Sequence, residues 1–104
     1  MRNQLELLLW DGCPSQPEAR ELARDFAQAV GLEITETRIT DFEQAQKYRF
    51  IGSPTFRVNG VDLVPDENPS FGLTCRVYRR PEGKISPLPS IQQLKEGLRS
   101  LNAD

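Results

Sequence analysis

Apolar and polar residues follow different periods along this chain, and the periods predict its strands and helices. Residues 5–10 are nearly all apolar, which is typical of a central strand covered on both faces. After this run the apolar residues recur at the spacing of an amphipathic helix, and we expect Gly31 to end this helix as a left-handed C-cap. The apolar positions of this helix are Ala19, Leu22, Ala23, Phe26 and Val30.

The start of this helix has two interpretations. Ser15 and Glu18 have the spacing of a capping box, which makes Ser15 the N-cap. Alternatively, Pro14 is the first helical residue and Cys13 is the cap.

The middle of the chain predicts an edge strand, a short helix and a hairpin. Residues 32–39 mix β-branched and charged side chains, as edge strands do. Thr40 and Glu43 form a second capping box, which opens a helix to about residue 48. Residues 55–58 and 61–64 flank Asn59-Gly60, the strongest short hairpin signal.

The last third predicts a loop, one more strand and a terminal helix. Residues 65–72 are rich in turn formers, and residues 81–83 form a turn. In residues 73–79 the alternation puts Leu73, Cys75 and Val77 on one face, which we expect to face the core. Ser90 and Gln93 cap a helix with one apolar stripe, Ile91, Leu94, Leu98 and Leu101.

These elements predict one α/β domain over residues 1–104 with the order β-α-β-α-β-β, an extra strand, then α. A helix joins the first two strands, so they should be parallel, and the hairpin adds antiparallel strands. We therefore expect a mixed sheet of four or five strands with flanking helices.

Composition narrows the functional classes. The net charge of -2 favours neither nucleic acid nor an anionic membrane, and Arg76, Arg79, Arg80 and Lys84 are interpreted as a solvated face. No apolar run approaches ~20 residues, and the first one is interrupted by Glu6, too short for a signal peptide. We expect a cytoplasmic protein. The absence of histidine excludes His-based acid–base chemistry and His-ligated metals.

Cys13 is the first candidate for chemistry. It follows a predicted central strand and precedes a helix, where free N–H groups and the helix dipole lower a thiol pKa. The alternative is a small buried residue beneath a turn. We predict a partly exposed Cys13 with a lowered pKa.

Four segments carry a resemblance to a known family: Gly12-Cys13-Pro14, residues 50–55 (FIGSPT), residues 58–62 (VNGVD) and residues 72–78 (GLTCRVY). Together they span nearly the whole chain. It resembles the thioredoxin-like superfamily, and within it small bacterial proteins grouped with alkylmercury lyase-like annotations. The last segment is the one that points to this smaller group.

The resemblance implies a thioredoxin-like fold with a cis peptide bond before Pro54. It implies that this proline lies against Cys13, and that Cys13 is the catalytic nucleophile. It also implies that Ser53 offers its backbone to an extended substrate or a thiol. The alternative is an ordinary trans-proline that begins an edge strand. We expect the substrate site around Cys13 to comprise Trp10, Pro14, Ser53, Pro54 and Thr55, although Trp10 has packing as its alternative.

The chain departs from the thioredoxin pattern in three places. Gln16 stands where a dithiol enzyme has its second cysteine, and Leu7 stands where thioredoxin has a buried acid. Residues 64–67 lack the glycine pair with which glutaredoxins hold glutathione. We expect no cofactor.

Three functions follow from these residues. The first is thiol–disulfide exchange through Cys13, with a protein or small-molecule thiol or disulfide as partner. The second is a carrier of a soft metal ion held by Cys13 and Cys75, and the third is a module that binds an extended peptide beside Pro54. Cys75 is either a second thiol or a core cysteine, and no resident metal site is expected. Because the alternation turns Cys75 to the core, we predict no Cys13–Cys75 disulfide in the resting protein.

Overall fold

The computed structural model describes residues 4–66 and 70–102, and within them the chain forms a small α/β domain. Its main sheet has four strands in the order β2-β1-β3-β4. The strands are β1 (Gln4–Trp10), β2 (Glu33–Ile39), β3 (Thr55–Val58) and β4 (Val61–Asp62). The predicted mixed α/β sheet is thus confirmed, with the edge strand at β2.

Strand directions follow the connections. β1 pairs with β2 in parallel and with β3 antiparallel, and β3 and β4 form a hairpin. At the hairpin turn Asn59 and Gly60 have φ angles of 53° and 79°. Both central residues of a type I′ hairpin turn need such positive angles, which explains the Asn-Gly pair.

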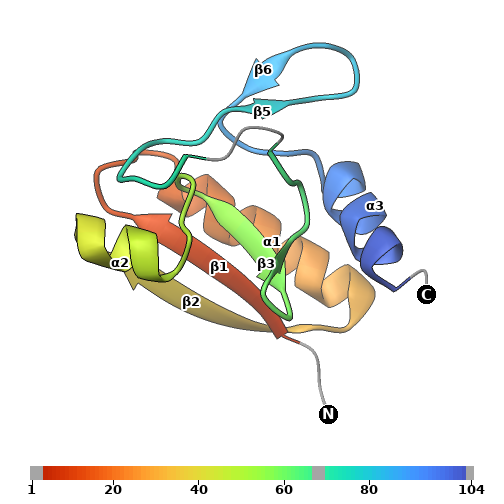
Figure 1. Cartoon of the computed structure of the whole chain (residues 1–104). Coiled ribbons are helices and arrows are strands. Elements are labelled where there is room, and N and C mark those ends of the chain that lie inside the picture. Colours follow the sequence, from red (N-terminus) through yellow and green to blue (C-terminus); the bar gives the residue numbers. More distant parts are fainter. Residues whose placement is uncertain (1–3, 67–69, 103–104) are drawn as a thin grey trace.

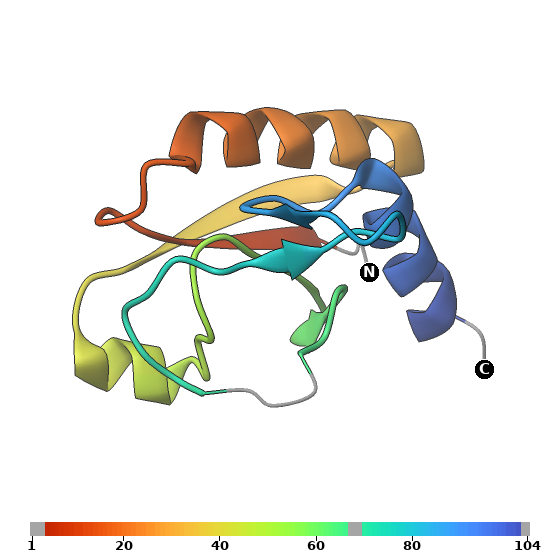
Figure 2. The ribbon, with the colours of Figure 1, turned by 90° about the horizontal axis from the view of Figure 1, so that it is seen from above.

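Three helices flank this sheet: α1 (Gln16–Val30), α2 (Phe42–Lys47) and α3 (Ile91–Leu101). Figure 2 shows α1 along one face and α2 on the opposite side, with α3 beside the far end of α1. Alternate leucines of β1 pack on the two opposite faces of the sheet. Leu5, Leu7 and Leu9 pack with α1 and α3, and Leu8 packs with α2, so β1 is buried on both faces as predicted.

The predicted strand over residues 73–79 is wrong in extent. Only β5 (Tyr78–Arg79) is a strand, and it pairs with β6 (Ile85–Ser86) in a separate two-stranded sheet above the main one (Figure 1). Residues 67–69 of the predicted loop lie outside the described residues.

The helix caps confirm part of the prediction. Ser90 and Gln93 form the complete capping box of α3, and Gly31 ends α1 at a φ of 77°. In α2 the N-cap is Asp41 rather than Thr40, because the Asp41 carboxylate accepts from the Gln44 N–H at 2.8 Å. In the part of the chain that the structure describes, no helix combines the length and apolarity needed to cross a bilayer.

Candidate functional site

The two segments that the sequence singled out meet at the end of β1. The peptide bond between Ser53 and Pro54 is cis, which confirms the prediction. The Trp10 N–H donates to the Ser53 hydroxyl at 3.1 Å, and the Cys13 sulfur lies 3.6 Å from the Ser53 carbonyl oxygen. Ser53 therefore joins the turn that carries Cys13 to the start of β3.

Cys13 lies in the turn between β1 and α1 and not in the helix itself. Its N–H donates to the Trp10 carbonyl at 3.1 Å, and α1 begins after Ser15, its N-cap. The Ser15 hydroxyl makes no capping hydrogen bond; it lies 3.3 Å from the Cys13 sulfur. Of the two interpretations of this helix start, the one with Ser15 as the N-cap is confirmed, but the predicted capping box with Glu18 does not form because the Ser15 hydroxyl contacts the thiol.

The Cys13 thiol is less exposed than predicted. Only 3% of its surface reaches solvent, so the prediction of partial exposure is wrong. Burial opposes ionisation of Cys13, but hydrogen bonds from Cys75, from the Ser15 hydroxyl and N–H, and from Ser53 outweigh it, so its pKa is lowered. The Ser53 carbonyl accepts only from the protonated thiol, and at 3.6 Å this is the longer of the two contacts measured at the sulfur.

An open pocket of about 450 Å³ gives access to this sulfur. Its walls are mainly apolar and come from the turn before α1 and its first residues, from the segment between β4 and β5, and from the stretch after β6. The lining residues are Cys13, Pro14, Ser15, Glu18, Cys75, Pro87 and Leu88. Sequence reasoning missed Pro87 and Leu88, since a loop position carries no periodic signal of what it covers.

Cys75 is exposed and shares this pocket with Cys13, so the prediction that it faces the core is wrong. Both thiols are free, and they line the same pocket close enough for each to change the acidity of the other. The hydrogen bond to Cys13, burial and the negative charge of Cys13 together raise the pKa of Cys75 to about 11. The nearby thiols thus differ in acidity, with Cys13 the stronger acid.

In residues 73–79 the side chains that are most buried are not the ones predicted, and the cause is the burial of Arg76. Arg76 is 6% exposed and Tyr78 is 2% exposed, whereas Val77 is 63% exposed. The Arg76 guanidinium pairs with Asp62 at 2.8 Å, donates to the Val64 carbonyl and lies over the Tyr78 ring. These partners allow Arg76 to be buried, which turns Cys75 and Val77 outward, whereas Leu73 still packs against the cluster of Leu8 and Phe50. Arg76 therefore does not belong to a solvated basic face.

The backbone of Ser53 is occupied by the chain itself. Its N–H donates to the Thr74 carbonyl at 2.9 Å, and its carbonyl accepts from the Arg76 N–H at 2.8 Å. Gly52 permits this close approach, because a Cβ there would lie 3.0 Å from the Arg76 Cβ and its φ is +140°. The backbone that we expected to face a substrate is paired with the segment that carries Cys75.

Two other predicted site residues have internal roles. Thr55 is fully buried and its hydroxyl donates to the Gly52 carbonyl at 2.6 Å. Trp10 packs on the cluster of Leu8 and Phe50, and its ring lies against Gly12, where a Cβ would come within 2.3 Å of it. Neither residue lines the pocket that holds the sulfurs, whereas Pro14 does.

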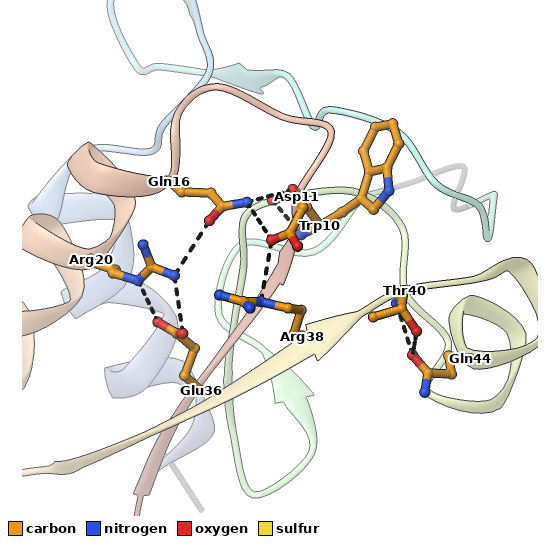
Figure 3. A network of polar contacts seen from close by, with 9 residues as sticks. Trp10, Asp11, Gln16, Arg20, Glu36, Arg38, Thr40 and Gln44 are labelled. Atoms are coloured by element: carbon orange, nitrogen blue, oxygen red, sulfur yellow. Dashed lines mark hydrogen bonds and ion pairs between the residues drawn. The ribbon is translucent and has the colours of Figure 1, made fainter.

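Gln16, at the place of the missing second cysteine, holds the turn instead. Its amide donates to the Trp10 carbonyl at 2.9 Å and to the Asp11 carboxylate at 3.2 Å. Figure 3 shows these contacts continuing from Gln16 to Arg20, and from Arg20 to Glu36. The network anchors the turn that carries Cys13 to α1 and β2.

Comparison of the chain with protein-family models, with curated proteins and with solved structures returned no match. Among the described residues no three Cys, Asp or Glu side chains gather as metal ligands.

Proposed function

We propose that this chain is a thioredoxin-like thiol protein in which Cys13 performs thiol–disulfide exchange. The observation that carries the proposal is that Cys13 lines an open apolar pocket and has its pKa lowered by hydrogen bonds. The strand and helix order and the cis bond at Pro54 support the thioredoxin-like assignment, since the resemblance implies both.

The reaction needs a thiolate that an entering disulfide can reach. The Cys13 thiolate attacks one sulfur of the substrate, forms a mixed disulfide and releases the other half as a thiol. The hydrogen bonds from Ser15 and Cys75 raise the fraction of thiolate near neutral pH. The apolar walls of Pro14, Pro87 and Leu88 favour a disulfide with apolar groups beside its sulfurs.

The test is the rate of alkylation of Cys13 by iodoacetamide against pH, with the modified residue identified by mass spectrometry. We expect a midpoint below that of a free cysteine, about 8.5. In Cys75→Ser, which leaves a hydroxyl donor beside Cys13, the midpoint should stay below 8.5. In Cys13→Ser the alkylation that has this low midpoint should disappear. A midpoint for Cys13 at or above the free value contradicts the proposal.

A second candidate function has its own support. The two thiols line one pocket, so together they are suited to hold a soft ion of low coordination number such as Hg²⁺. Titration with Hg²⁺ in the presence of a competing monothiol tests this candidate. A carrier binds one ion per chain and loses tight binding in both Cys13→Ser and Cys75→Ser. If the monothiol removes Hg²⁺ equally well from the wild type and from both variants, the carrier function is excluded.

The peptide-binding module loses its support. That function required free backbone groups of Ser53 as a strand edge for the peptide. The N–H and the carbonyl are both engaged with residues 74 and 76 of the same chain.

A further inference from the structure

Two thiols from distant parts of the chain are held against the same residue. Cys13 reaches the Ser53 carbonyl from the turn after β1, at 3.6 Å. Cys75 is held by the hydrogen bonds of its neighbours, Thr74 and Arg76, to the Ser53 backbone. These contacts form an isolated parallel bridge between Ser53 and Cys75, so the place of Cys75 beside Cys13 is built by backbone pairing.

The anchorage of this segment extends beyond the bridge. The next residue, Arg76, is buried against Asp62, and the Tyr78 hydroxyl donates to the Pro54 carbonyl. Cys75 itself is exposed at the pocket. A reactive side chain on a firmly held backbone needs little further ordering before it reacts.

We propose that Cys75 is the resolving thiol of Cys13, so that the two cysteines form an intramolecular disulfide in each reaction cycle. This inference rests on the proposed thiol–disulfide exchange at Cys13. It assigns to a residue 62 positions downstream the part that a second cysteine three residues after the first has in a dithiol motif.

The cycle consists of two exchanges. First, the Cys13 thiolate attacks a substrate disulfide, the bond between the substrate sulfurs breaks, and one half leaves as a thiolate that takes up a proton. Second, the Cys75 thiolate attacks the Cys13 sulfur of the mixed disulfide, and the other half leaves in the same way. The substrate gains two electrons, and the protein dithiol becomes the Cys13–Cys75 disulfide. A dithiol reductant returns the protein to its starting state by the reverse exchanges.

The electrostatics of the pair order these two steps. While Cys13 carries the negative charge, its hydrogen bond and its charge keep Cys75 protonated. Formation of the mixed disulfide removes that charge and leaves the Cys13 sulfur a much weaker hydrogen-bond acceptor. The pKa of Cys75 then falls toward that of an ordinary cysteine, so the second thiolate forms only when it is needed.

The test uses the reduced full chain and one molar equivalent of 4,4′-dithiodipyridine, a neutral disulfide that releases a chromophoric thiopyridone. We expect the wild-type chain to release two thiopyridones per reagent molecule and to end as a monomer lighter by two hydrogens, without an adduct. Cys75→Ser should release one thiopyridone and keep a pyridyl adduct on Cys13. Cys13→Ser should react more slowly and keep its adduct on Cys75.

The outcomes separate the two proposals. If the wild-type chain stops after one thiopyridone with the adduct on Cys13, or forms a disulfide-linked dimer, the resolving role of Cys75 is wrong and exchange at Cys13 stands. If the first release is as slow in the wild type as in Cys13→Ser, exchange at Cys13 itself is wrong. The count of released thiopyridone in the wild type depends on no variant, so poor folding of a variant leaves the test intact.

Discussion

Ser53 and Cys75 face each other in a one-residue parallel bridge, and this pairing brings the second cysteine of the chain to the first. The bridge uses the N–H and the carbonyl of the residue before the cis-proline. A strand edge that we expected to receive a substrate thus holds a thiol of the same chain.

Replacing Cys13 should change the acidity of Cys75. In the wild type the pKa of Cys75 is raised to about 11, mainly by its hydrogen bond to Cys13. Because serine stays neutral, we expect the pKa of Cys75 to fall in Cys13→Ser. Alkylation of Cys75 at pH 8 should therefore be faster in Cys13→Ser than in the wild type. An unchanged rate means that the two thiols do not interact.

Ser15→Ala should raise the pKa of Cys13, because it removes the hydroxyl 3.3 Å from the sulfur. A hydrogen bond worth ~1 kcal/mol corresponds to a rise of about 0.7 pKa units. The alkylation midpoint measures this rise, and the helix should lose little stability because this side chain makes no cap bond.

Ser90→Ala is the matched control for Ser15→Ala. The Ser90 hydroxyl does cap its helix, by accepting from the Gln93 N–H at 3.1 Å. We expect this control to lower the free energy of unfolding by ~1 kcal/mol and to leave the Cys13 midpoint in place. The reverse pattern, with the midpoint moved by Ser90→Ala alone, contradicts the role given to Ser15.

Glu18 should make the pocket selective against anionic disulfides, because this acidic residue is part of the pocket lining. We expect Glu18→Gln to speed the reaction of Cys13 with glutathione disulfide about fivefold at low ionic strength, equivalent to ~1 kcal/mol at an exposed site. The rate with neutral dithiodipyridine should stay unchanged. Glu21→Gln, on the same helix but outside the pocket lining, is the control and should alter neither rate.

Gly52→Ala should both destabilise the protein and displace Cys75. The new Cβ would lie 3.0 Å from the Arg76 Cβ at a φ of +140°, so strain and overpacking add. We expect the free energy of unfolding, measured in urea, to fall by about 3 kcal/mol or more, and the second thiopyridone release to disappear. Gly31→Ala is the control, since it has a positive φ of +77° but nothing within 4 Å, and should cost ~1 kcal/mol. Equal losses in the two variants would show that the contact with Arg76 is unimportant.

The buried pair of Arg76 and Asp62 should contribute far more than an exposed one. Arg76→Met leaves the Asp62 carboxylate, 17% exposed, without its cation, which should cost about 3–5 kcal/mol. Adding Asp62→Asn should recover part of this, since the amide oxygen can still accept from the Val64 N–H. Arg20→Met, which breaks the exposed pair with Glu36, should cost under ~1 kcal/mol. Similar unfolding free energies for Arg76→Met and Arg20→Met contradict this account.

Local patterns in the sequence determined the parts of the structure that depend on neighbouring residues. The sequence alone predicted the apolar run of β1, the apolar stripe and C-cap of α1, the Asn-Gly turn and the Ser90 capping box. Each of them depends on side chains and backbone groups a few residues apart, so a short window of sequence holds the full cause. The candidate role of Cys13 was readable in the same way, from a strand that leads into a helix.

Tertiary structure alone decided what lies opposite Cys13. The alternation of residues 73–79 pointed Cys75 inward, and burial of Arg76 turned it outward. The cause lies outside that window: Asp62 supplies the countercharge, and Ser53 supplies the backbone bonds. A charged side chain is buried only where distant partners satisfy it, and no local period records those partners. The sequence therefore singled out Cys13 as the candidate thiol, whereas packing between distant segments placed Cys75 beside it.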